Sequence, residues 1–261
     1  MLHKKSSHFG HLTQLARWFK TPIGKIFQQA ELPLVGEMLS KNFRKEVLQI
    51  DWVGWEKECH QHMRFSHFTV IDSQSNDKGE YAQLIGNAQE MPIETHSVDI
   101  VILPHSLEFQ EDPHQVLREV NRILRPEGIV LLLGFNPWAI WHLPRFLPRA
   151  KNKTPWNGRF ISRSRVIDWL KLLNFSIDKN QGYCFFPLVH YQPSHQAKII
   201  LESIAAWFPV MPAAYFLVGV KRVTGSTPIF HLRDIKERFI SPIIEPTNKT
   251  SYVKKENKNI H

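Results

Sequence analysis

Two acidic side chains follow the first two predicted strands of the chain, and their spacing is typical of a nucleoside site. Asp51 opens a short turn after the apolar strand Glu46 to Ile50, and Asp72 ends a second strand, Phe68 to Ile71. Asp72 lies about twenty residues beyond that turn, the spacing at which an acidic residue binds ribose hydroxyls in nucleotide-binding folds. From Asp72 alone, an Asx-turn or a helix cap explains the residue equally well.

The loop after the fourth predicted strand offers one candidate for acid–base chemistry. It reads Leu103-Pro104-His105-Ser106-Leu107-Glu108, and His105 is its one side chain of a type that ordinarily titrates near neutral pH. We therefore predict that His105 faces the acceptor of a reaction. The alternative is a structural role, because isolated histidines are more often structural and this chain holds fourteen.

Strands and helices alternate along the chain, which favours a doubly wound, mostly parallel sheet. Five strands are expected before a long insertion at about 136–161, and two after it, the first starting near Asn174. The others are Glu46–Ile50, Phe68–Ile71, Tyr81–Ile85, Val98–Leu103, Ile129–Leu133 and Tyr215–Val220. In such sheets, ligands bind beyond the carboxyl ends of the strands, so we expect Asp51, Asp72 and His105 at one edge.

The helix signals support this alternation. Asp112 is a predicted N-cap, and Pro113 suits the first helical position that follows it. That helix is expected to stop at Arg125-Pro126-Glu127-Gly128. An earlier helix is expected from Thr21-Pro22, with Pro33 breaking or restarting it.

The stretch 87–136 resembles the second half of a class I S-adenosylmethionine (SAM)-dependent methyltransferase domain of the small-molecule type 11 family. It reads Asn-Ala-Gln-Glu-Met-Pro, then a strand, a helix, Arg-Pro-Glu-Gly and a final apolar run. Over Trp18 to Ile229, the order of motifs is also similar to an uncharacterised bacterial subfamily in which the glycine-rich turn is degenerate. The resemblance implies an α/β, Rossmann-like, doubly wound sheet of seven mostly parallel strands, with N-terminal helices and a flexible C-terminal tail.

The same resemblance implies SAM as the cofactor. In this family, a glycine-rich turn follows the first strand, an acidic residue ends the second, and an Asp-Ala-type pair after the third contacts adenine. The residues that match these positions, with one from the loop after the fourth strand, are Asp51, Trp52, Gly54, Asp72, Asn87, Ala88 and Pro104. Of the expected glycines only Gly54 remains, and Asp51 and Trp52 occupy positions where small residues normally permit a positive φ. Asn87 can replace the usual Asp because an amide both donates and accepts, with a simple turn as its alternative.

The charge distribution favours an anionic partner. The net charge is +9, and the stretch from Gly128 to Ile167 contains no acidic residue. Such surfaces attract anions. We therefore expect a small or carrier-bound anionic acceptor that contacts Arg145 and Arg149, against the alternative of a merely soluble basic protein.

Three features that the sequence lacks bear on its cellular location and on metal binding. Cys59 and Cys184 form no CxxC pair, and the N-terminus has no continuous apolar stretch of a signal peptide, so we expect a cytoplasmic protein without a metal site. The uncharged stretch Ser203 to Val220 contains Pro209 and Pro212. It is therefore expected to form a helix end, a turn and a buried strand, and not a transmembrane segment.

The expected organisation is an N-terminal helical extension (1–44), a methyltransferase-like domain (45–226) and a basic flexible tail (227–261). The leading functional hypothesis is a SAM-dependent methyltransferase. The first alternative, favoured by the degenerate turn, is a catalytically inactive scaffold that binds a partner. The second is an RNA-directed methyltransferase, suggested by basic stretches interleaved with Trp138, Trp141 and Trp156. It ranks last, since the sequence contains no recognised RNA-binding module, and nucleic acid is the less favoured partner.

Overall fold

The computed structural model describes residues 15–41, 46–56, 59, 67–73, 82–139, 155, 157–185 and 211–223. The chain divides into two compact units, Met1–Thr224 and Gly225–His261, and all described residues belong to the first. The helix end expected after Ser203, most of the insertion at 136–161 and the tail 227–261 lie outside the described residues.

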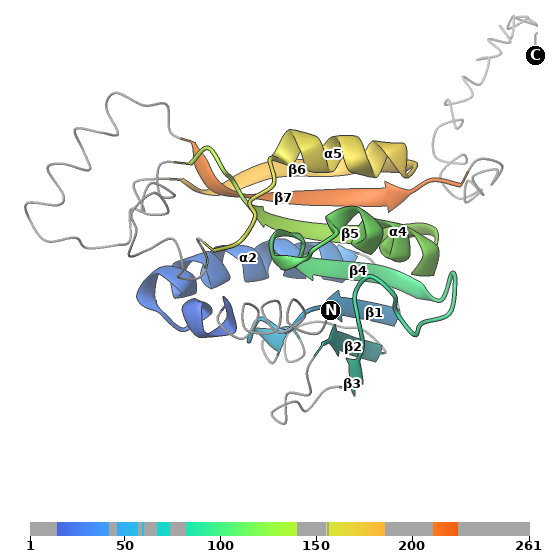
Figure 1. Cartoon of the computed structure of the whole chain (residues 1–261). Coiled ribbons are helices and arrows are strands. Elements are labelled where there is room, and N and C mark those ends of the chain that lie inside the picture. The colour runs from blue at the N-terminus through green and yellow to red at the C-terminus, as the bar shows by residue number, and fades with distance from the viewer. Residues whose placement is uncertain are drawn as a thin grey trace, which may run out of the picture. The chain divides into compact units, whose positions relative to one another are not determined.

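Seven strands form one sheet in the order β3-β2-β1-β4-β5-β7-β6 (Figure 1). The strands are β1 Glu46–Ile50, β2 His67–Asp72, β3 Ala82–Ile85, β4 Val98–Pro104, β5 Leu124–Phe135, β6 Phe175–Phe185 and β7 Pro212–Lys221. The helices are α2 Pro22–Lys41, the 3-10 turn η1 Leu107–Phe109, α4 Pro113–Ile123 and α5 Arg163–Leu172. Strands β1 to β5 pair in parallel, whereas β7 runs antiparallel to both β5 and β6. The predicted seven-stranded, mostly parallel, doubly wound sheet is confirmed.

Successive strands are added on one side of β1 up to β3 and on its other side from β4 onward, so the switch point of the sheet lies between β1 and β4. From β1 the chain proceeds outward through β2 to β3, and it then returns to β4 on the other side of β1. In doubly wound sheets, ligands bind outside the carboxyl ends of the strands at this crevice. The carboxyl ends of β1, β2 and β4 are therefore where a functional site is expected.

Side chains of the central strands alternate between two hydrophobic layers. In β5, residues 129, 131, 133 and 135 join one layer and residues 130 and 132 join the other. The first layer contains the buried face of α2, and the second contains the buried faces of α4 and α5. Figure 1 shows the same separation, with α2 on one face of the sheet and α4 and α5 on the other.

Two expectations about helix ends are corrected. Helix α2 runs unbroken from Pro22 to Lys41, with Pro33 inside it, so the predicted break at Pro33 is wrong. Pro33 removes one backbone hydrogen bond, but burial of Phe27, Val35 and Leu39 on the same helix offsets that loss. Helix α4 starts as predicted, where Asp112 accepts a hydrogen bond from the Gln115 amide at 3.1 Å. It ends at Ile123, ahead of the predicted stop, and residues 125–128 form an irregular first part of β5.

The apolar stretch near the C-terminus contains the expected strand. Its described part, 211–220, enters β7, whose residues 213–219 are buried. No helix within the described ranges has both the length and the apolar character needed to cross a bilayer.

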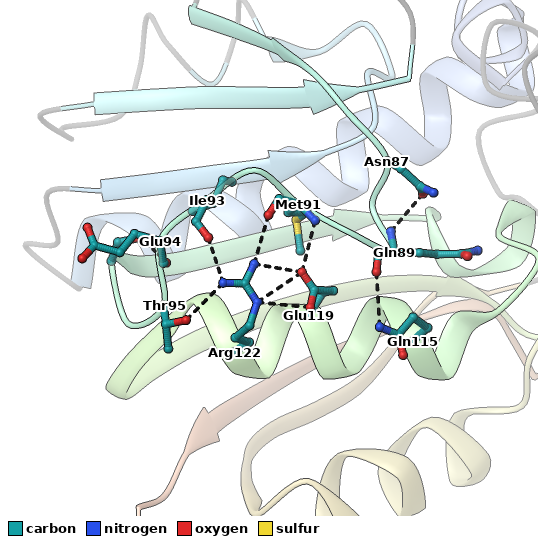
Figure 2. A network of polar contacts seen from close by, with 10 residues as sticks. Asn87, Gln89, Met91, Ile93, Glu94, Thr95, Gln115, Glu119 and Arg122 are labelled. Atoms are coloured by element: carbon teal, nitrogen blue, oxygen red, sulfur yellow. Dashed lines mark hydrogen bonds and ion pairs between the residues drawn. The ribbon is translucent and has the colours of Figure 1, made fainter.

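The loop after β3 is fastened to α4 by one arginine (Figure 2). The Arg122 guanidinium donates to the carbonyl oxygens of Ile93 at 2.8 Å and Met91 at 3.0 Å. Glu119, one turn earlier, pairs with the same guanidinium at 2.9 Å and accepts from the Met91 amide at 3.1 Å. Gln115 adds a bond to the Gln89 carbonyl at 3.3 Å. Helix α4 therefore holds the loop that begins with Asn87 and Ala88.

We predict that Arg122→Met loosens this loop. The substitution keeps most of the apolar stem but removes the donors to two loop carbonyls, which should lower the free energy of unfolding by about 1–3 kcal/mol. Chemical denaturation measures that loss, and hydrogen exchange of the Met91 and Ile93 amides reports the loop. Arg118→Met is the matched control, because Arg118 lies exposed on the same helix and, among the described residues, its side chain bonds only to Gln115 of that helix. Equal losses in the two variants would contradict a specific role for Arg122.

Candidate functional site

The structure brings Asp51, Trp52 and Asp72 together at the carboxyl ends of β1 and β2. The Asp51 amide donates to the Ile71 carbonyl at 2.8 Å, and the Trp52 amide lies 3.4 Å from Asp72 Oδ2. Both acidic residues are buried, with exposed fractions of 3% for Asp51 and 9% for Asp72. Burial first, and then the neighbouring charge of Asp72, raise the pKa of Asp51 to about 7.

Asp51 adopts the backbone conformation that a glycine would favour at this turn. Its φ is 68°, in the left-handed region, where aspartate is tolerated better than larger or branched residues. Gly54 has φ 95° in the same turn. The shape of the turn therefore depends on only one glycine, with a short polar side chain at its first residue.

The loop after β4 is tied to the same place. Ser106 donates its hydroxyl to the Ile50 carbonyl at 2.7 Å, and the Gln110 side-chain amide donates to Asp51 Oδ2 at 3.2 Å. Both side chains are buried. The carboxyl ends of β1, β2 and β4 thus converge on one partly buried group of polar side chains at the switch point.

The backbone of the turn after β1 is held from inside by Glu56. One oxygen of its carboxylate accepts from the Val53 amide at 2.8 Å, and the other accepts from the Gly54 amide at 2.9 Å. The Gln49 side chain donates to the same carboxylate at 2.7 Å. Burial raises the pKa of Glu56 to about 7, while these hydrogen bonds oppose the shift. Two amides of the turn therefore already have an internal carboxylate partner, and the Val53 and Trp55 side chains fill the core.

Asn87 and Ala88 lie at the end of β3, as predicted. The Gly86 amide donates to the Asp72 carbonyl at 2.9 Å, so the pair follows directly after a backbone contact with the second strand. The Asn87 side chain is exposed and accepts from the Gln89 amide at 3.0 Å, which is the turn contact considered as its alternative role. Ala88 is buried against α4 and its neighbours. Contact of this pair with adenine stays a prediction.

His105 lies in the core, with an exposed fraction of 0%. Its Nε2 is 2.9 Å from Glu31 Oε1 on α2, and its ring stacks on Phe135 at 3.9 Å between centroids. Tyr183 on β6 donates to the same oxygen of Glu31 at 2.8 Å. Burial alone would lower the pKa of His105, but Glu31 and Glu108 outweigh it and raise the pKa to about 9. His105 thus connects the end of β4 with α2 and is shielded from solvent.

Of the remaining predicted site residues, Pro104 is buried as the last residue of β4, Trp52 is half-buried and Gly54 is exposed. Arg145 and Arg149 lie outside the described residues. Sequence reasoning missed Glu31, Glu56 and Gln110. For Glu31 a signal was present, because it stands four residues after Phe27 and four before Val35, on the buried stripe of α2.

A cavity of about 280 Å³ opens near the N-termini of α4 and α5. It is lined by Pro113, His114, Arg159, Phe160, Ile161, Arg165 and Trp169. The segment before α5 reaches this position because the Arg159 amide donates to the Glu108 carbonyl at 2.7 Å. Gly158 packs against the Phe109 ring, where a side chain would come within 3.0 Å of a ring carbon. Both contacts join the segment to η1, directly after β4.

We predict that Asp51→Asn changes how stability depends on pH. The pKa of Asp51 is raised from 3.8 to about 7, so near neutral pH the folded chain holds a proton that the unfolded chain has lost. Its favourable contribution is complete below about pH 4 and is lost as the pH rises to about 7. The neutral amide should therefore raise the free energy of unfolding by about 1–3 kcal/mol at pH 8.

Denaturant unfolding at pH 5 and pH 8 measures this difference. The gain should be clearly smaller at pH 5, and Asp178→Asn, at an exposed position on β6, should show no such trend. An equal effect of Asp51→Asn at both pH values would show that the Asp51 carboxyl is not buried in its acid form.

Comparison with known proteins adds sequence relatives. The model of the type 11 methyltransferase domain family matches residues 60–132. The chain is 30% identical over 160 residues to the uncharacterised protein YafS of Escherichia coli K12, covering 61% of this chain and 65% of that protein. It is 26% identical over 96 residues to a demethylmenaquinone methyltransferase of Chlamydia pneumoniae, covering 36% of this chain and 41% of the other. The chain therefore spans less than two thirds of the length of these relatives.

Solved structures show the same fold. A SAM-dependent methyltransferase of Thermotoga maritima superposes with a TM-score of 0.56 at 18% identity, over 79% of this chain and 94% of the other. One of Archaeoglobus fulgidus gives 0.52 at 16% identity, over 73% and 94%. The strand order, the acidic residue at the end of β2 and the match of residues 60–132 agree with these similarities. The chain therefore has the fold of class I methyltransferases, and its residues 60–132 match the type 11 methyltransferase domain family.

Proposed function

We propose that the chain is a SAM-dependent methyltransferase that acts on a small anionic acceptor. One observation carries the proposal, which is that the buried carboxylates of Asp51 and Asp72 and the Trp52 backbone meet at the switch point of the sheet. SAM is the cofactor of the type 11 family. The names of the relatives from Chlamydia pneumoniae and Lactococcus lactis, both demethylmenaquinone methyltransferases, also support methyl transfer.

The residues present fit the nucleoside end of SAM. Asp72 offers a buried carboxylate where a ribose would be held, and the Asn87–Ala88 pair follows β3 beside it. SAM supplies an electrophilic methyl group that an acceptor takes up by in-line displacement. Such a displacement depends mainly on positioning, so the chain does not need an acid–base residue at the reacting atom.

The methionine part of SAM would have to be bound here without the backbone amides of a glycine-rich turn. The amides of Val53 and Gly54 are bound to Glu56, so they are not directed toward a ligand. We assign the cationic ammonium group to the Asp51 carboxylate and the contact along the methionine chain to Trp52. His105 takes a positioning role in this proposal, because its contacts hold the end of β4 against α2.

A second candidate function is a scaffold that binds a partner without catalysis. The observation that favours it is that the Val53 and Gly54 amides of the turn donate their hydrogen bonds to Glu56. Under this alternative the carboxylate of Glu56 replaces the ligand contacts of the turn. The two candidates differ in one property that can be measured directly, which is affinity for SAM.

We predict that SAM binds to the purified chain and that Asp72→Ala weakens binding by about 1–3 kcal/mol, because one set of charge-assisted hydrogen bonds is lost. Calorimetric titration with SAM and with its demethylated product measures both affinities. Asp178→Ala removes an exposed carboxylate on β6 and should leave them unchanged. If millimolar SAM gives neither heat nor a thermal shift, the scaffold function replaces the enzymatic one.

We also predict that SAM affinity rises with pH through the titration of Asp51. Its pKa is raised to about 7, so the carboxyl is mostly neutral at pH 5.5 and becomes anionic above pH 7. An anionic Asp51 attracts the ammonium group, so binding should tighten between pH 5.5 and 7.5. Titrations across this range should show a flat profile for Asp51→Asn. If SAM affinity of Asp51→Asn depended on pH as steeply as that of the unchanged chain, Asp51 would not be the group that binds the ammonium of SAM.

A further inference from the structure

The cavity between α4 and α5 carries an unusual set of side chains. Arg159 and Arg165 line it from two directions, the first from the segment before α5 and the second from the first turns of that helix. Neither guanidinium forms an ion pair or a side-chain hydrogen bond within the part of the chain that the structure describes. Two cations that share a cavity without a carboxylate partner create a local positive potential.

Neighbouring groups strengthen that potential. Ser162 precedes α5 without a side-chain capping bond, so the first amides of the helix add partial positive charge near the two arginines. The carboxylate of Asp112, the N-cap of α4, accepts a hydrogen bond from the Gln115 amide. The cavity therefore combines two exposed guanidinium donors with the N-terminus of a helix.

Three of the other five lining residues carry aromatic rings, namely His114, Phe160 and Trp169. The His114 and Trp169 rings lie 3.9 Å apart between centroids, and the Phe160 ring contacts Phe135 at 5.5 Å. A volume of about 280 Å³ equals roughly nine water molecules at their share of liquid volume. That space suits a ring bearing one anionic group, with the guanidinium planes on the oxygens and the indole beside the ring.

The cavity is also close to the carboxylate pair. Gln110 bonds to the Asp51 carboxylate, and Pro113, three residues later, lines the cavity. Three residues span at most about 11 Å of chain. A ligand in the cavity is therefore near the edge at which Asp51 and Asp72 meet.

We propose that this cavity is a binding site for a small aromatic anion, an aryl phosphate or an aryl carboxylate, held by Arg159 and Arg165 and contacted by Trp169. Its assignment as the acceptor site rests on the proposed methyltransferase function, whereas anion binding itself does not. Arg159 and Arg165 both lie in the stretch Gly128 to Ile167, which has no acidic residue and from which Arg145 and Arg149 were expected to contact the acceptor.

Titration of the full chain with phenyl phosphate, benzoate and the neutral benzyl alcohol tests the site. We expect at least one of the two anions to bind at least tenfold more tightly than benzyl alcohol, with an affinity that falls as salt is added. The preferred anion identifies the ligand class as phosphate or carboxylate. Arg159→Gln and Arg165→Gln should each weaken that anion about tenfold, since one charge-assisted contact is lost.

Matched variants separate this site from general attraction to a basic chain. Arg163→Gln removes a neighbouring exposed arginine of α5 that does not line the cavity, and it should leave binding unchanged. Trp169→Leu should weaken phenyl phosphate or benzoate but not inorganic phosphate. Equal loss in Arg163→Gln, equal binding of benzyl alcohol, or no binding of either anion would each overturn the proposal.

Two cross-titrations distinguish failure of this site from failure of the proposed function. Arg159→Gln and Arg165→Gln should bind SAM as the unchanged chain does, and Asp72→Ala should bind the aryl anion normally. Anion binding without SAM binding would end the methyltransferase proposal and leave the anion site in place. SAM binding without anion binding would end the anion-site proposal and leave the methyltransferase proposal in place.

Discussion

The turn after β1 depends on the buried carboxylate of Glu56. A carboxylate taken out of water is costly unless donors surround it, and here the Val53 and Gly54 amides and the Gln49 side chain provide them. These bonds direct the turn amides inward, which in turn allows Val53 and Trp55 to fill the core beneath the turn. The position of Asp51 at the end of β1 follows from that turn, and so does its burial beside Asp72. Hydrogen bonds to an internal carboxylate thereby hold the turn whose counterpart in the type 11 methyltransferase family is rich in glycine.

The two faces of the sheet have different consequences for function. On the α2 face, the Glu31 carboxylate joins His105 at the end of β4 to Tyr183 on β6, and these groups are closed off from solvent. On the other face, a cavity near the N-termini of α4 and α5 is lined by Arg159 and Arg165, whose guanidinium groups have no ion-pair partner among the described residues. Buried charged contacts of the first kind specify how elements pack, whereas exposed cations in a cavity remain available to a ligand. This contrast is why we propose the α4–α5 face as the acceptor side.

The methyltransferase fold indicates where a site is expected but does not identify the acceptor. The strand order and the acidic residue after β2 belong to the scaffold, and one scaffold supports many substrates. In the proposed anion site, the segment before α5 contributes Arg159 and Phe160, whereas α4 contributes His114 and α5 contributes Trp169. The identity of the acceptor is therefore a question about those side chains and not about the fold.

The sequence alone determined the elements and the edge of the sheet at which the site lies. Apolar runs bounded by turns predicted the strands, and Asp112-Pro113 predicted the start of α4, because these signals are local and act through neighbouring residues. The partner of each polar side chain was decided only by tertiary structure. His105 looked like an acid–base candidate, but α2 brings Glu31 against it from 74 residues away. Pro33 looked like a helix break, but packing against the sheet carries α2 through it. Packing between distant segments determines which charged groups lie beside a buried side chain and whether an unfavourable backbone position is tolerated. Residue spacing along the chain does not show which distant segments will pack together.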